Sequence, residues 1–180
     1  KKGDRVAICM ANNPEYIISY IALTSMGAVC VLLNSWWVPG EVSYGLENSQ
    51  AKILVADQKR LSGLEKFQDV QKIIVRPDSD SKFSNFNDFI SSHEKTFPVV
   101  DLDTNDNATI FYTSGSTGFP KGVLSTHRNI LATLFSWALV TTLKREVEAA
   151  EAASELSPQI PQSDVPVNQS AILHCVPLFH

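Results

Sequence analysis

The sequence predicts an α/β fold: a doubly wound, mostly parallel sheet with flanking helices. Before residue 77, short apolar runs alternate with segments that carry helical signals, at the spacing typical of βαβ units. The runs are apolar at consecutive positions instead of every second one, which is expected of strands that are buried on both faces. Right-handed crossovers then determine most of the topology.

Four strands are expected in this first part of the chain, at residues 5–10, 28–33, 52–57 and 72–76. The first intervening helix should begin at Asn13-Pro14, a favourable cap followed by proline at the first helical position, and end at Gly27. Its expected apolar face consists of Ile17, Ile18, Tyr20, Ile21 and Leu23.

Two further helices are expected between the later strands. A second, weaker helix is predicted at residues 39–46, and a third should pass through Leu61, Leu64 and Phe67. Residues 77–107 are polar and rich in turn formers, so we interpret them as a surface connection. One short amphipathic helix should interrupt this connection at its apolar residues, Phe83, Phe86, Phe89 and Ile90.

The second part of the chain begins with a strand at residues 109–112. Residues 122–126 are expected to form the return arm of a hairpin, and His127 should begin a long helix that continues to residue 155. Within residues 144–169 we expect a helical extension that is rich in alanine and glutamate, and then a proline-rich flexible insertion. A last strand is expected at residues 171–176.

Composition limits the classes of protein to consider. The chain has 180 residues, of which 44% are hydrophobic and 19% are charged, and this fits one globular domain. A net charge of −4 gives no general attraction to nucleic acid, and no apolar run has the length of a transmembrane helix. No targeting signal is visible, so we expect an intracellular protein. Cys9, Cys30 and Cys175 are interpreted as core residues in a reducing compartment.

A small-residue loop directly follows the strand at 109–112 and is the main candidate site. It contains four hydroxyls and two glycines: Thr113, Ser114, Gly115, Ser116, Thr117 and Gly118. Glycine permits the backbone conformations and the close approach that a phosphate cradle needs, and the hydroxyls add hydrogen-bond donors. Lys121 supplies a positive charge for phosphate oxygens.

This loop is not a Walker A motif. That motif requires a lysine directly after its second glycine, whereas here Phe119 and Pro120 separate Gly118 from Lys121. The alternative interpretation is a flexible Ser/Gly linker with a solvated lysine. The position of the tract directly after a strand, together with Pro120-Lys121-Gly122, favours an anion-binding loop.

Residues 113–122, Thr-Ser-Gly-Ser-Thr-Gly-Phe-Pro-Lys-Gly, resemble the signature loop of the AMP-forming adenylating enzymes, a superfamily that includes acyl-CoA synthetases, luciferases and peptide-synthetase adenylation domains. Shorter stretches at 3–8, 27–34, 46–57 and 177–180 are similar to other parts of an acyl-CoA synthetase and occur in the same order. Residues 144–169 depart from the family pattern, which has a short connection there.

The resemblance implies ATP-dependent activation of a carboxylic acid, such as a fatty acid or another hydrophobic acid, to an acyl-adenylate, followed by transfer to CoA. It implies that Thr113 to Gly118 hold the phosphates of ATP, that Lys121 is catalytic, and that Thr113 also meets Mg²⁺. In the family pattern His180 borders the acyl pocket; a structural role at the end of a strand is the alternative for this residue.

The resemblance further implies an N-terminal piece of an AMP-binding domain, because the adenine-binding stretch, the ribose-binding Asp and the C-terminal catalytic Lys have no counterpart in the sequence. We therefore expect residues 1–180 to be inactive alone, in a cytoplasmic or peroxisomal parent enzyme. Three alternatives stay open: a non-catalytic nucleotide-binding module, an adenylating ligase that uses a carrier-protein thiol, and an α/β interaction domain with an incidental Ser/Gly loop.

Overall fold

The computed structural model describes residues 1–61, 64, 67, 69–79, 81–113 and 118–153. The chain divides into two compact units. The described part of the first is Lys1–Arg128, and the second begins at Asn129 and is described to Ala153. Among the described residues, no helix combines the length and the hydropathy needed to cross a membrane.

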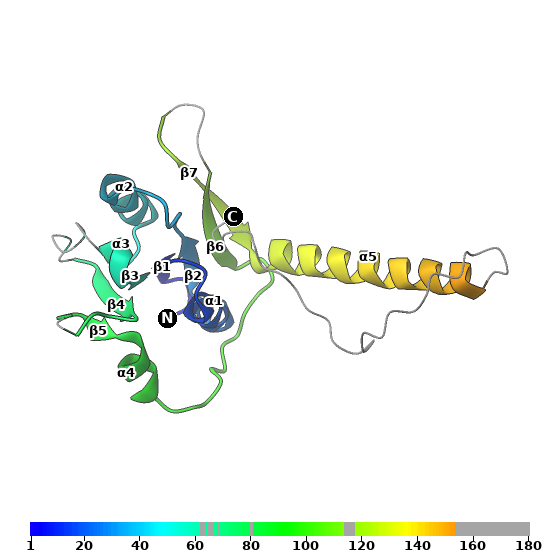
Figure 1. The fold of residues 1–180 in the computed structure, drawn as a ribbon, viewed down its shortest axis with the longest axis horizontal. Coiled ribbons are helices and arrows are strands. Elements are labelled where there is room, and N and C mark those ends of the chain that lie inside the picture. Colours follow the sequence, from blue (N-terminus) through cyan, green and yellow to red (C-terminus); the bar gives the residue numbers. More distant parts are fainter. Residues whose placement is uncertain (62–63, 65–66, 68, 80, 114–117, 154–180) are drawn as a thin grey trace. The chain divides into compact units, whose positions relative to one another are not determined.

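The first unit is built on one sheet, in which the described residues form seven strands in the order β5-β4-β3-β1-β2-β6-β7 (Figure 1). All neighbouring strands pair in parallel except β6 and β7, which are antiparallel. The predicted α/β fold with a mostly parallel sheet is therefore confirmed. The strands are β1 (Arg5–Cys9), β2 (Val29–Leu32), β3 (Ile53–Asp57), β4 (Gln71–Val75), β5 (Ser84–Asn85), β6 (Asn107–Thr113) and β7 (Lys121–Thr126).

Helices cover both faces of this sheet because the chain passes from β1 through α1 to β2 on one side of β1, and then returns through α2 to β3 on the other side of β1. The helices α1 (Pro14–Ser25) and α4 (Phe86–Ser91) pack on one face, and α2 (Pro39–Ser49) and α3 (Gln58–Leu61) pack on the opposite face (Figure 1). Side chains of one strand alternate between the two faces of the sheet. Cys9 belongs to the core between the sheet and α2, and Cys30 belongs to the core between the sheet and α1.

The expected apolar face of α1 is confirmed for Tyr20 and Leu23, which pack against the core, and is wrong for the three isoleucines. Tyr16 and Ser19 are the buried residues of this helix, Tyr20 and Leu23 are half-buried, and the isoleucines at 17, 18 and 21 are exposed. The buried set has the i, i+3, i+4, i+7 spacing of one helical face. Hydrophobicity alone favours the isoleucines, whereas the structure buries the face that contains Tyr16 and Ser19. Asn13 is the N-cap residue, as predicted, although its side chain makes no capping hydrogen bond.

The third predicted helix is too long. α3 ends at Leu61, and Leu64 and Phe67 are not helical, although Leu64 is buried in the core and Phe67 packs against it. Glycine has a low helix propensity, and Gly63 follows Leu61 in the sequence by two positions. The apolar pattern alone does not take this into account and therefore predicts too long a helix. Within the connection at 77–107, the structure adds the two-residue edge strand β5, which was not predicted.

The helix α5 (His127–Ala153) begins at the predicted residue. It includes the first part of the expected helical extension at 144–169. Residues 154–180, with the expected proline-rich insertion, the last strand and His180, lie outside the described residues.

Candidate phosphate-binding site

The hairpin of β6 and β7 fixes the two ends of the candidate loop. Thr113 ends β6 and pairs directly with Lys121, the first residue of β7. The predicted return arm is therefore confirmed. Gly118, Phe119 and Pro120 are described, whereas the predicted phosphate ligands Ser114, Gly115, Ser116 and Thr117 lie outside the described residues.

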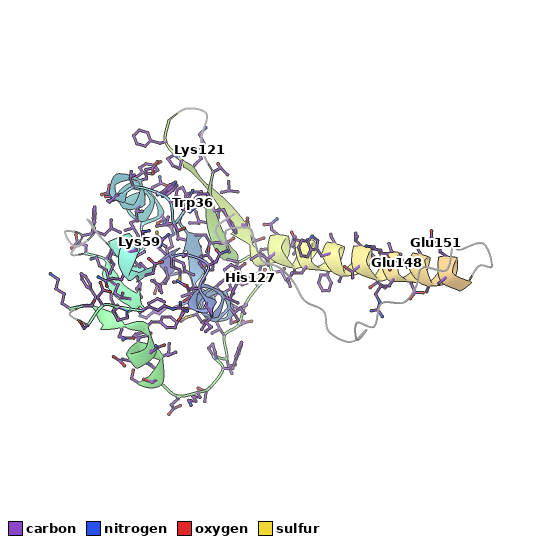
Figure 2. All side chains as sticks on the ribbon, in the orientation of Figure 1. Trp36, Lys59, Lys121, His127, Glu148 and Glu151 are labelled. Carbon is purple, nitrogen blue, oxygen red and sulfur yellow. The ribbon has the colours of Figure 1, made fainter. Side chains whose placement is uncertain are left out.

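The hairpin lies at the edge of the sheet where parallel sheets bind ligands. β6 pairs in parallel with β2, so Thr113 lies at the carboxyl edge together with the residues that follow β1, β2 and β3. Open α/β sheets bind ligands outside the carboxyl ends of their strands. Figure 2 labels Lys121 together with Trp36, which follows β2, and Lys59, which follows β3.

The side chains at the two ends of the loop are accessible. Thr113 and Lys121 are both exposed, and the Thr113 hydroxyl donates a 3.4 Å hydrogen bond to the Lys121 carbonyl oxygen. In the described part of the chain, no carboxylate forms an ion pair with the Lys121 ammonium group. A lysine whose charge is not neutralised by protein is available to an anionic ligand.

Gly118 adopts a backbone conformation that suits glycine. Its φ is +105°, a value that residues with a side chain rarely adopt, and a Cβ atom at this position would have no atom within 4 Å. Glycine is therefore favoured at this position because of its positive φ, and not because a side chain would collide with neighbouring atoms. The open space beside it is compatible with close approach of a ligand to the backbone.

An ion pair joins the carboxyl ends of the neighbouring strands. The Asp57 carboxylate accepts hydrogen bonds from the backbone N–H groups of Ala11 (2.9 Å) and Arg60 (3.1 Å), and its Oδ2 lies 3.1 Å from Arg60 Nη1. Arg60 Nε donates to the carbonyl oxygen of Ser35. These contacts connect the segments that follow β1, β2 and β3, and so stabilise the edge on which the hairpin lies.

A hollow of about 460 Å³ opens beside this ion pair. Its lining combines aromatic and cationic side chains, with Trp36 69% exposed and Trp37 half-buried. The lining residues are Ser35, Trp36, Trp37, Pro39, Val42, Lys59 and Arg60. Trp37 packs edge-to-face against Tyr112, whereas Trp36 is mostly exposed.

No sequence motif marks the residues that support the site. Asp57 was identified only as the end of a strand, and Tyr112 only as a strand residue. A charged residue at the carboxyl end of a buried strand, three residues before an arginine, is a signal that could have identified the first. The Tyr112 contacts involve residues 64 and 67 positions away in the sequence, so no local pattern predicts them.

The described residues offer little of a metal site by themselves. They contain no group of three or more His, Cys, Asp or Glu side chains that could hold a metal ion. The exposed Thr113 hydroxyl is an oxygen ligand of the kind that Mg²⁺ accepts. A single hydroxyl of this kind is compatible with Mg²⁺ but does not by itself make a metal site.

A model of one protein family, described as AMP-binding enzyme, matches residues 1–180. The chain is 35% identical over 144 residues to a medium/long-chain-fatty-acid–CoA/3-oxocholest-4-en-26-oate–CoA ligase of Mycolicibacterium smegmatis; the match covers 75% of this chain and 26% of the relative. It is 28% identical over 184 residues to 4-coumarate–CoA ligase 2 of Solanum tuberosum, a match that covers all of this chain and 30% of the relative.

A solved structure agrees with these sequence matches. A Mycobacterium tuberculosis fatty acyl CoA synthetase superposes with a TM-score of 0.62 at 27% identity, over 76% of this chain and 27% of that one. The chain thus spans less than a third of the length of each of these three proteins. The family model, which matches residues 1–180, includes the sheet and the hairpin that carries the candidate loop.

Proposed function

The chain belongs to the family of AMP-binding enzymes, and from this premise we propose that the complete protein containing it activates a carboxylic acid with ATP and transfers the acyl group to coenzyme A. The observation that carries the proposal is the hairpin at the carboxyl edge of the sheet, where Thr113 and Lys121 face each other across a loop of hydroxyl residues and glycines. The ligase names of the relatives support the same reaction class.

The proposed reaction has two steps, and its only reactants are the carboxylic acid, ATP and coenzyme A. A carboxylate oxygen attacks the α-phosphorus of ATP, the bond from that phosphorus to the bridging oxygen breaks, and pyrophosphate leaves with that bonding electron pair. The thiol of coenzyme A then attacks the acyl carbon, loses its proton, and displaces AMP. Transfers of this kind depend mainly on positioning and on stabilisation of charge.

Residues of this chain supply charge and position in the first step. The Lys121 ammonium group offsets the negative charge that develops on the departing pyrophosphate, and the backbone near Gly118 approaches the phosphate oxygens closely. Ser114 to Thr117 are proposed to donate their hydroxyl and amide hydrogens to the β- and γ-phosphates. Lys121 is the proposed catalytic residue, since it contacts the group that leaves.

We also propose that Thr113 is a ligand of a Mg²⁺ ion that binds together with ATP. When bound, this ion neutralises phosphate charge, and the exposed Thr113 hydroxyl would contribute one oxygen ligand to it. Replacement of Thr113 by valine should therefore raise the Mg²⁺ concentration that half-maximal adenylate formation requires. His180 stays a proposed residue of the acyl pocket.

We propose a hydrophobic carboxylic acid as the substrate class. The two relatives are named for a fatty or steroid acid and for 4-coumarate, and all of these join an apolar body to one carboxyl group. Because the chain spans 26–30% of the length of these relatives, we also propose that residues 1–180 alone do not complete the reaction.

The experiment is carboxylate-dependent exchange of labelled pyrophosphate into ATP by the complete protein. A panel of fatty acids of several lengths and hydroxycinnamic acids should include at least one that supports exchange, and addition of coenzyme A should convert the same acid to a thioester. Absence of exchange with every acid, in a folded protein that still binds ATP, would instead favour a non-catalytic nucleotide-binding module. Exchange without a thioester would favour a carrier-protein thiol as the acceptor.

A further inference from the structure

The helix α2 contacts the β6 arm of the hairpin and the segment that directly precedes β7. On the β6 arm, the Tyr112 hydroxyl lies 2.8 Å from Asn48 Oδ1 and 3.2 Å from the Gly45 carbonyl oxygen. Its single hydrogen can serve one acceptor at a time, and the shorter distance favours Asn48. Tyr112 directly precedes Thr113, so α2 holds β6 one residue before the loop begins.

Gly45 allows α2 to lie close enough for this contact. A Cβ atom at position 45 would lie 2.7 Å from Leu33 Cδ2 and 3.0 Å from Trp37 Cζ3, distances that normal packing does not allow. Trp37 in turn contacts Tyr112 edge-to-face, with 5.5 Å between ring centroids and 67° between ring planes. The Tyr112 ring is thus held by α2 and by the segment that precedes it.

The Tyr112 ring also fits against the other arm. Tyr112 pairs with Gly122 across the hairpin, and a Cβ atom at position 122 would lie 3.4 Å from the Tyr112 ring and 3.0 Å from Ile110 Cγ2. A cross-strand pair of aromatic and glycine brings the ring over the backbone of β7. Displacement of Tyr112 therefore displaces the residue next to Lys121.

A second contact from α2 reaches the loop itself. The Phe119 ring packs against Tyr44 of α2, with 5.1 Å between centroids and 33° between planes. Phe119 is 70% exposed, so the contact buries little apolar surface. Its main consequence is to restrict the backbone between Gly118 and Lys121.

From these contacts we infer that α2 is the positioning element of the phosphate-binding hairpin, with Tyr44 and Tyr112 as positioning residues for Lys121 and for residues 118–120. This inference rests on the proposed function. Neither tyrosine needs to touch ATP, because each acts through the hairpin backbone. A misplacement of about 1 Å can reduce the rate of a reaction that depends on alignment by up to roughly a hundredfold.

The first test compares Tyr44→Ala with Tyr44→Phe in the complete protein. We expect Tyr44→Ala to lower kcat/KM for ATP in pyrophosphate exchange by about tenfold, while thioester formation from preformed acyl-adenylate changes less than twofold. Tyr44→Phe keeps the ring and should restore exchange. Phe97→Ala is the matched control, because Phe97 is a 75% exposed aromatic residue outside the hairpin and α2; it should leave both half-reactions unchanged.

The second test uses the hydrogen bond on the other arm. Tyr112→Phe and Asn48→Ala each remove one partner of the 2.8 Å contact. If the contact positions the hairpin, the double variant should lose no more exchange activity than the worse single variant, because both remove the same interaction. Independent, additive losses would contradict a shared positioning role.

A readout without catalysis separates failure of this inference from failure of the proposed function. Trypsin cleaves after Lys121, and loss of the Tyr44 ring should increase the cleavage rate of the Lys121–Gly122 bond severalfold, with Tyr44→Phe close to wild type. If wild type shows no exchange but cleavage responds to Tyr44→Ala, the function fails and the positioning contact stands. If wild type shows exchange and Tyr44→Ala matches it, or if both half-reactions fall equally, the inference is wrong.

Discussion

Thr113 and Lys121 lie directly opposite each other in the β6–β7 pair, and the Thr113 hydroxyl donates to the Lys121 carbonyl oxygen. The two residues belong to different strands but end the same loop, so movement of one arm displaces the other. This relationship connects a proposed metal-facing hydroxyl with a proposed phosphate-facing ammonium group.

The backbone of Gly118 should tolerate no side chain without strain. Because its φ is +105°, we expect Gly118→Ala to lower the free energy of unfolding by about 1–3 kcal/mol and to reduce pyrophosphate release. Gly118→Val should reduce pyrophosphate release further, since its branched side chain also occupies the space beside the loop. Denaturant unfolding and a pyrophosphate assay on the complete protein measure the two effects.

Gly40→Ala is the matched control for Gly118. Gly40 lies in the first turn of α2, without positive φ and with no atom within 4 Å of a Cβ at that position. Alanine there should change the free energy of unfolding by no more than about 0.5 kcal/mol. Equal effects of Gly118→Ala and Gly40→Ala would show that the unusual φ has no energetic consequence.

The ion pair between Asp57 and Arg60 should be a main stabilising contact of the carboxyl edge. Its side chains are 11% and 19% exposed, and Asp57→Ala leaves the guanidinium group of Arg60 and the N–H of Ala11 without this acceptor. We expect a loss of about 3 kcal/mol in the free energy of unfolding. Asp57→Asn, which keeps one acceptor oxygen, should lose less.

The exposed pair of Lys144 and Glu148 provides the comparison for Asp57. These side chains are separated by 3.7 Å and are mostly in solvent, so Glu148→Ala should cost less than about 0.5 kcal/mol. Denaturant unfolding measures both variants. Asp57→Ala and Glu148→Ala with the same small effect would remove the proposed role of Asp57 at the edge.

The sequence predicted the elements whose apolar pattern extends over several residues. It did not predict features that depend on individual tertiary contacts. Consecutive apolar residues predicted the buried strands β1 to β4, since a sheet covered on both faces has no polar side. The face of α1 was not predictable from hydrophobicity, because Tyr16 and Ser19 are buried and more apolar neighbours are exposed. β5 has only two polar residues, too few to show any strand periodicity.

The site was predictable only in its local part. The sequence located the loop between Thr113 and Lys121, because small residues, glycines and a lysine followed a strand. It could not locate Asn48 or Tyr44, since their contacts with the hairpin arise from the close packing of α2 and span more than 60 residues. The residues of a loop can be identified from the sequence, whereas the residues of distant elements that contact the loop can be identified only from the three-dimensional structure.

Cys9 and Cys30 should be unreactive in the folded protein. Burial raises the pKa of Cys9 to about 12 and raises that of Cys30 as well. A raised pKa means that the reactive thiolate is suppressed at pH 8, and it is regained on unfolding, when the pKa returns to its ordinary value. Alkylation by iodoacetamide, followed by mass spectrometry of the two peptides, should increase strongly in denaturant. Rapid labelling of either peptide before unfolding would contradict the buried positions.

The measurement that tests the central claim most directly is the effect of Lys121→Ala on the two half-reactions of the complete protein. Pyrophosphate release should fall by roughly ten- to a hundredfold, because one charge is lost from a loop whose other donors remain. Thioester formation from preformed acyl-adenylate should be unchanged, since no pyrophosphate takes part in it. Lys95→Ala, in the exposed connection before β6, should alter neither. If Lys121→Ala lowered both half-reactions equally while the protein stayed folded, the hairpin would be a structural element and not a phosphate-binding site.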